Sequence, residues 1–254
     1  MFPQFLRKPT RAVRKPKTPE SRELQVAGRM VPLAIRENLR ATRITLRIEP
    51  GGRALKMTIP KGVREADVAD FLDRHRGWLE VKLSKYSGDA KVRAGGTLAL
   101  RGVEHRIHHT GQLRGITEAV MLDGEPVIRV SGHEEHLGHR LSTFLKKEAR
   151  LDLDRLVAIH TGRLGKRAKS LTMKDTRSRW GSCSWEGNLS FSWRIVMAPP
   201  EVIDYLAAHE VAHLKEMNHG PQFWALCKSL CPGMDEAKSW LKRHGSELHA
   251  IDFD

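Results

Sequence analysis

The sequence has few cysteines and no long apolar run. Its 254 residues include three cysteines, Cys183, Cys227 and Cys231, and so small an odd number argues against a disulfide framework. Cys227 and Cys231 lie one helical turn apart and could bind a metal, but burial as small apolar residues is the simpler interpretation. No apolar stretch approaches the roughly 20 residues of a membrane-spanning helix, and no apolar segment follows the basic N-terminus as in a secretory signal. We therefore expect a cytoplasmic globular protein without membrane contact.

Acidic residues are outnumbered by basic ones. The chain has 44 Lys and Arg against 30 Asp and Glu, which gives a formal net charge of +14. This excess permits contact with DNA, nucleoprotein or other polyanions without requiring it. Residues 1–22 combine four prolines with seven basic residues and bury too little apolar surface to fold. We expect a disordered tail there, with a basic arm for nucleic acid as the functional alternative.

Residues 23–132 are predicted to form an α+β module of short antiparallel strands. Alternating apolar residues in 43–48 and 54–60 flank Gly51-Gly52 and predict a hairpin. Apolar residues at helical spacing predict a helix over 65–85. Further strands are expected at 97–100, 104–108, 119–122 and 126–130.

Residues 133–254 are predicted to form a second domain. A long helix is expected from about Glu134 to Leu164. Three strand-like segments follow, at 170–175, 179–184 and 189–196. Pro200 suits the first position of a further helix, which is expected to continue to about Glu216. Another helix is expected from Pro221 to about Leu230. The order of helix, small antiparallel sheet and helix is zincin-like, so the fold class is α+β.

The helix that begins at Pro200 carries the segment His209-Glu210-Val211-Ala212-His213. Residues four apart share one face of a helix, so His209 and His213 can bind one ion. Glu210 can reach a water on that ion and act as a general base. This residue pattern is typical of a catalytic Zn²⁺ site in a metallopeptidase.

Catalytic zinc requires a third protein ligand, and His219 follows His209 by ten residues. The spacing matches the metzincin pattern in length, but Glu216 stands where metzincins have glycine, so we do not assign that class. We expect the helix to run further before it turns toward His219.

Other histidines carry weaker signals. His133-Glu134-Glu135-His136 has no clear third ligand, and His105, His108 and His109 lie on a predicted strand. We expect both groups to be solvated surface residues.

Several segments together resemble one known family. They are Arg179-Trp180-Gly181-Ser182-Cys183, residues 189–194, residues 198–205, the metal motif and residues 218–224. They resemble the YgjP-like metallopeptidase family, which is related to SprT-like zinc peptidases. The resemblance is close over about residues 170–245 and looser over most of the chain after Val31.

The resemblance implies one zinc ion bound by His209, His213 and His219, with Glu210 as the base. Gly220 departs from the family, which commonly has serine there. Zincins bind extended substrate on an edge strand, and residues 189–196 are our candidate for that strand. The block Arg179–Cys183 has two interpretations. It contacts substrate, with Arg179 as an anion donor, or it is a packing corner in which Trp180 fills core and Gly181 permits a bend. Cys183 as a zinc ligand is a minor alternative.

The leading hypothesis is a zinc-dependent metallopeptidase that cleaves proteins or peptides. The alternatives are a peptidase associated with nucleic acid, a zinc-stabilised binding module, and a zinc amidase acting on a small substrate. Several divalent ions suit three histidines, so the sequence does not decide the metal.

Overall fold

The computed structural model describes residues 20–26, 28–84, 91–176 and 179–254. It divides into two compact units, with the division after residue 85. Residues 1–19 of the expected tail lie outside the described residues, but residues 20–22 belong to a strand, so the tail was predicted too long. Within the described ranges, no helix has both the length and the apolar character needed to cross a membrane.

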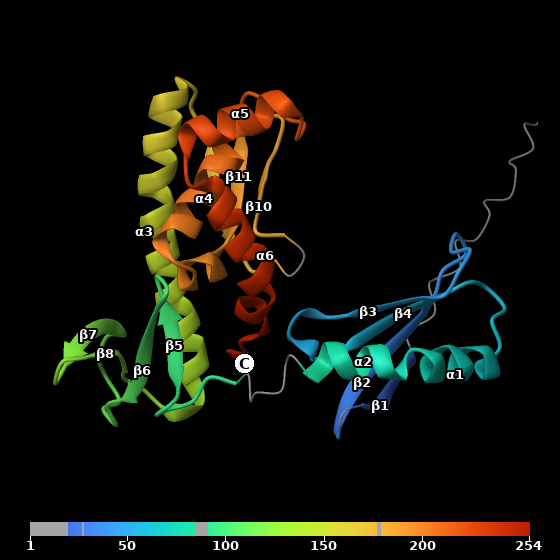
Figure 1. The fold of residues 1–254 in the computed structure, drawn as a ribbon. Helices are drawn as coiled ribbons and strands as arrows, with labels where there is room; N and C mark the ends of the chain where they lie inside the picture. Colours follow the sequence, from blue (N-terminus) through green and yellow to red (C-terminus); the bar gives the residue numbers. More distant parts are fainter. Residues whose placement is uncertain (1–19, 27, 85–90, 177–178) are drawn as a thin grey trace, which may run out of the picture. The chain divides into compact units, whose positions relative to one another are not determined.

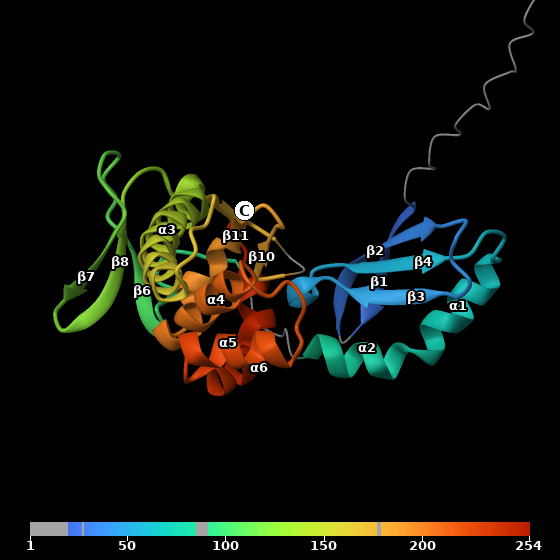
Figure 2. The ribbon, with the colours of Figure 1, turned by 90° about the horizontal axis from the view of Figure 1, so that it is seen from above.

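The first unit is a four-stranded sheet with two helices (Figures 1 and 2). Its elements are β1 Glu20–Val26, β2 Arg29–Glu37, β3 Thr45–Ile48, β4 Leu55–Ile59, α1 Glu65–Arg74 and α2 Arg76–Leu83. Alternate residues of β2, namely Val31, Leu33 and Ile35, are buried, because successive side chains of a strand point to opposite faces. The predicted hairpin is β3 and β4, which pair antiparallel.

The helix predicted over 65–85 is two helices in the structure. The break falls at His75, whose φ of −101° and ψ of 3° are not helical. The imidazole of His75 stacks on Phe71 at 4.0 Å between ring centroids, and its Nδ1 lies 2.7 Å from the carbonyl oxygen of Phe71. Apolar periodicity continues across the break, so the sequence pattern did not reveal it.

In its described residues, the second unit contains two sheets and four α-helices. The first sheet has the order β5-β6-β8-β7 and the second has the order β10-β11-β9. Its elements are β5 Thr97–Leu100, β6 Val103–His109, β7 Glu118–Leu122, β8 Glu125–Val130, α3 Leu137–Leu164, β9 Ser170–Lys174, β10 Gly181–Cys183, β11 Asn188–Ser192, α4 Pro200–Ala212, α5 Pro221–Leu230 and α6 Met234–Ala250. Short 3₁₀ helices, Glu134–His136 and Trp193–Met197, precede α3 and α4. The α+β class is confirmed.

The expectation of purely antiparallel strands was wrong. Each sheet contains one parallel pair: β2 with β4, β6 with β8, and β9 with β11. Alternating apolar residues report which face of a strand is buried, but not the direction of its neighbour. The sequence pattern therefore located the strands without determining how they pair.

The expected domain boundary at residue 132 differs from the division observed at residue 85. The strands of residues 97–130 share a core with α3 and α4. At the β5–β6 turn, the backbone N–H of Arg101 donates to the carbonyl of Val196, at 2.7 Å. The Arg101 side chain forms ion pairs with Glu148 and Asp152 of α3. These strands therefore belong to the unit that holds the histidine motif.

Helix α4 lies in the middle of the second unit and packs against α3, α5 and α6 (Figure 1). Buried His160 of α3 lies 2.8 Å from the carboxylate of Asp204 on α4. Buried Arg194 pairs with Asp175 and donates to the backbone carbonyls of Leu248 and Ile251. The first contact ties α4 to α3, and the Arg194 contacts tie the 3₁₀ helix that precedes α4 to the C-terminal end of α6.

Candidate metal centre

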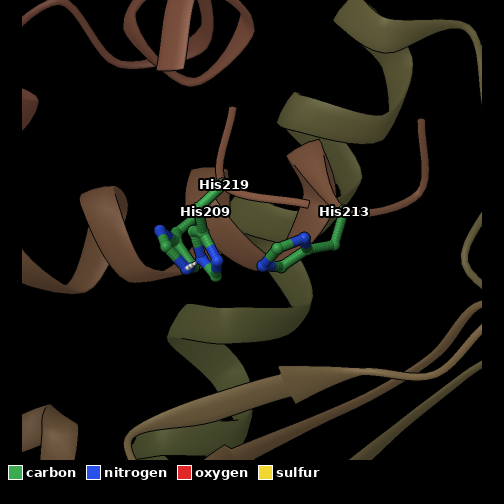
Figure 3. Close-up of side chains that lie close together, drawn as sticks. All are labelled: His209, His213 and His219. Atoms are coloured by element: carbon green, nitrogen blue, oxygen red, sulfur yellow. Dashed lines mark hydrogen bonds between the residues drawn. The ribbon is translucent and has the colours of Figure 1, made fainter. Parts of the chain in front are cut away.

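The three predicted ligands come together at the end of α4. The ligand atoms of His209, His213 and His219 all lie within 4.8 Å of one another, and Figure 3 shows the three imidazoles clustered together. The Nε2 atoms of His209 and His219 are 3.1 Å apart. Two nitrogens bound to one tetrahedral Zn²⁺ at about 2.0–2.1 Å would be about 3.3 Å apart. The donor set therefore fits a single small divalent ion.

Hydrogen-bond partners position the three histidines: those of His213 and His209 contact the imidazole, and that of His219 contacts its backbone. Nδ1 of His213 lies 3.0 Å from the carbonyl oxygen of Glu216, which leaves Nε2 for a metal. Nδ1 of His209 lies 3.5 Å from the hydroxyl of buried Tyr205. The indole N–H of Trp224 donates to the carbonyl of His219, at 3.1 Å. Partners of this kind fix which ring nitrogen faces the ion.

An apolar ring completes the support. The Phe223 centroid lies 4.9, 4.5 and 4.6 Å from those of His209, His213 and His219. Burial lowers the pKa of His209 to about 3, with the neighbouring histidines as a smaller cause. Burial also lowers the pKa of His213. The neutral imidazole is the form that binds metal ions.

The chain turns toward His219 earlier than expected. Helix α4 ends at Ala212, and the amides of Leu214, Lys215 and Glu216 close a tight turn onto Val211 and Ala212. The prediction that the helix continues to about Glu216 was therefore wrong. Because the helix ends early, the Glu216 carbonyl lies outside it and can contact the His213 imidazole. In a continuous helix this carbonyl would point along the helix axis.

Glu210 lies beside the histidines and is 3% exposed. Burial raises the pKa of its carboxyl group to about 8, and the charge of Arg179 opposes this shift. Its Oε2 is buried and has no hydrogen-bond partner among the described residues. A buried carboxylate oxygen without a partner is costly, so this oxygen is available to a group outside the chain.

Strand β10 packs directly on Glu210. A Cβ atom at Gly181 would overlap the Glu210 carboxylate. The packing-corner interpretation gave Gly181 the role of permitting a bend, whereas in the structure its missing side chain makes room for that carboxylate. Trp180 stacks on His249 of α6, with centroids 4.0 Å apart, so it has a packing role. Arg179 is exposed and acts on Glu210 through its charge.

The proposed substrate strand, residues 189–196, is not an edge strand. β11 spans Asn188–Ser192 and lies between β10 and β9, so both of its backbone edges are paired. Residues 193–196 belong to a 3₁₀ helix. Among the described residues, the edge strand of this sheet that contacts α4 is β10.

The remaining candidate ligands stay apart from the cluster. Cys183 is partly buried, and burial raises the pKa of its thiol to about 11, with Glu210 as a smaller cause. Cys227 and Cys231 are buried. Among described residues, the histidines at 209, 213 and 219 form the only group of three that could hold a metal.

Three residues support the histidines without having been predicted to do so: Tyr205, Phe223 and Trp224. Tyr205 precedes His209 by one helical turn, and this spacing was a usable signal. Phe223 and Trp224 follow His219 at the start of α5, but no spacing rule predicts that their rings pack on the histidines.

The fold and the site define a metal-dependent hydrolase: three histidines converge, and a buried glutamate stands beside them. Residues 42–244 match the family model described as YgjP-like, metallopeptidase domain. This match covers most of the chain, which therefore belongs to the YgjP-like family and is a metal-dependent peptidase.

Other comparisons add little. A crystal structure of the metallopeptidase zymogen of Pyrococcus abyssi abylysin is 22% identical, and the match covers 36% of this chain and 90% of that chain. Its TM-score of 0.32 is too low to carry an argument. No curated protein shows a significant match to the chain.

Proposed function

We propose that the chain is a zinc-dependent peptidase in which His209, His213 and His219 hold one Zn²⁺ and Glu210 is the general base. The observation that carries the proposal is the convergence of three imidazoles beside a buried carboxylate that has an unpartnered oxygen. Three protein ligands leave one position of a tetrahedral ion open, as catalysis requires. A purely structural zinc would call for a fourth protein ligand.

A bound zinc ion would polarise the scissile carbonyl and make the attacking water more acidic. Glu210 accepts a proton from this water as the water oxygen bonds to the carbonyl carbon. Glu210 then returns the proton to the amide nitrogen as the C–N bond breaks. The products are a carboxylic acid and an amine. Arg179, whose charge acts on Glu210, is a candidate to stabilise the negative charge that develops on the carbonyl oxygen.

We assign substrate binding to β10 instead of β11. β10 is an edge strand and packs on the helix that carries the histidines. Its free backbone edge can pair with an extended peptide by adding a strand. The arrangement of α3, a small mixed sheet and α4 supports a zincin-like domain. The open edge favours a peptide over a small amide substrate.

Glu210→Gln tests the proposal, because glutamine has nearly the shape of glutamate but cannot accept the proton. We expect zinc content to stay near one ion per chain, while cleavage of an unfolded protein such as casein falls at least a thousandfold. Glu134→Gln, at an exposed position, is the matched control and should leave both quantities unchanged. Cleavage that persists in the zinc-loaded Glu210→Gln variant would refute the role of the base. A fourth protein ligand on the bound ion, detected by X-ray absorption, would instead support a structural site.

A further inference from the structure

A basic groove lies away from the metal centre. It has a volume of about 610 Å³ and runs between the first half of α3 and the loop that joins β6 to β7. Its basic lining residues are His136, His139, Arg140 and Lys147. No aspartate or glutamate lines this part of the described structure. The groove therefore presents an attractive field to an anion.

The basic side chains are available for binding. His136, His139 and Lys147 are exposed. Within the described ranges, Arg140 and Lys147 form no ion pair, and His136 lies 3.6 Å from Glu135. The Arg140 guanidinium also donates to the carbonyl of Gly115 at 3.4 Å, which ties α3 to the opposite wall. The groove therefore has two connected walls, and no described acidic residue neutralises Arg140 or Lys147.

The spacing of the hydrogen-bond donors in the lining indicates a polymer. His136, Arg140, Thr143 and Lys147 recur about once per helical turn and so follow one another along the helix, and each can donate to a phosphate oxygen. From His136 to Lys147 they span about 16 Å at a rise of about 1.5 Å per residue. A single strand of nucleic acid places one phosphate about every 3.4 Å when stacked. The row thus matches several successive phosphates, whereas a free phosphate would occupy only one end.

The groove also offers apolar contact. Ile116, on the loop, is 70% exposed, and Phe144 of α3 lies in the lining. A row of basic and hydroxyl donors beside apolar side chains can hold a strand by its backbone while its bases pack on the protein. An acidic peptide could satisfy the charges, but it rarely carries one charge at every residue.

We propose that this groove binds a single strand of nucleic acid through its phosphate backbone. The peptidase chemistry does not use this surface. Arg140 and Lys147 of the groove contribute to the net charge of +14.

The test compares two variants that change the charge equally on one helix. Thr143→Glu/Lys147→Glu alters two exposed groove positions, and Arg155→Glu/Ala158→Glu alters two exposed positions of α3 outside it. Each pair changes the net charge by −3. The probe is a fluorescein-labelled eight-nucleotide oligothymidylate, and its affinity is measured by anisotropy from 50 to 200 mM NaCl. Circular dichroism melting establishes that both variants are folded.

We expect the groove variant to lose at least tenfold in affinity at 50 mM NaCl and its salt slope to fall by about one. The control should change by less than threefold. Cleavage of casein without nucleic acid should be unchanged in both, so failure of this inference is separate from failure of the proposed peptidase. Equal losses in the two variants, or an unchanged groove variant, would overturn the proposal. Displacement by polyglutamate as efficient as by unlabelled oligothymidylate would also overturn it, in favour of an acidic-peptide site.

Discussion

Two segments of this chain have nearly the same composition and very different surroundings. His209-Glu210-Val211-Ala212-His213 lies on α4, where Glu210 and His213 are buried. His133-Glu134-Glu135-His136 lies just before α3, and all four residues are exposed. The first has two imidazoles one helical turn apart and a third from a following loop. The second has imidazoles 6.2 Å apart at an angle of 88° and is not part of the metal cluster.

The comparison shows that a metal centre requires more than the correct residue types. A helix of standard geometry places residues four apart on one face, whereas His133 and His136 are three apart around a 3₁₀ turn. Phe223, Tyr205 and the Glu216 carbonyl fix the imidazoles of the first segment. Holding free histidines in one geometry would otherwise cost side-chain entropy on binding.

The largest effect on zinc content and activity is expected when one histidine is replaced in each of the two segments. His213→Ala should reduce zinc content from one ion per chain to near zero and abolish peptidase activity. Zinc affinity should fall by more than the 10–100-fold that typically follows the loss of a contact to a ligand. His136→Ala should change neither quantity. Metal analysis and a casein assay on both variants measure this, and a metal-free His136→Ala protein would contradict the assignment.

A smaller effect is expected when the ligands stay and only the neighbour of Glu210 changes. Gly181→Ala places a methyl group where the Glu210 carboxylate lies, so the base must move. A displacement of about 1 Å can cost about 100-fold in rate, and we expect kcat to fall by roughly that factor while zinc stays bound. Gly220→Ala is the control, because a Cβ there meets open space. Equal activity in the two variants would show that Glu210 does not depend on the shape of β10.

The smallest effect concerns a histidine that is shielded from water but holds no metal. Burial lowers the pKa of His249 to about 4, and the charge of Arg194 adds to the shift. The unfolded chain takes up a proton near the ordinary pKa of about 6.5, whereas the folded chain does so only near pH 4. The free energy of unfolding should therefore fall as the pH decreases from about 6.5 to 4.

His249→Phe keeps a ring to stack on Trp180 and removes the titrating group. Urea unfolding at several pH values measures the free energy of unfolding. Between pH 6.5 and 4 it should decline less steeply in the variant than in the native chain. Above that window the two proteins should differ by a constant amount. Parallel curves would mean that His249 takes up its proton in the folded state as readily as in the unfolded state.

Much of the fold could be predicted where a local pattern determines it. Helix α5 has the predicted bounds, and α4 begins at Pro200 as predicted, because proline fits the first turn of a helix. The hairpin around Gly51-Gly52 is present. Strand β1 and helix α6 were not predicted, and α6 supplies packing for Trp180 and the Leu248 carbonyl that accepts from Arg194.

The sequence by itself determined which residues could meet at the site. The spacing of His209 and His213, with Glu210 between them and His219 beyond a turn, follows from helix geometry and needs no tertiary information. Only the tertiary structure decided that Glu210 lies against Gly181, that β11 is central while β10 is free, and that residues 97–130 join the second unit. The physical reason is that helix periodicity acts over a few residues, whereas strand pairing and burial depend on segments far apart in the chain.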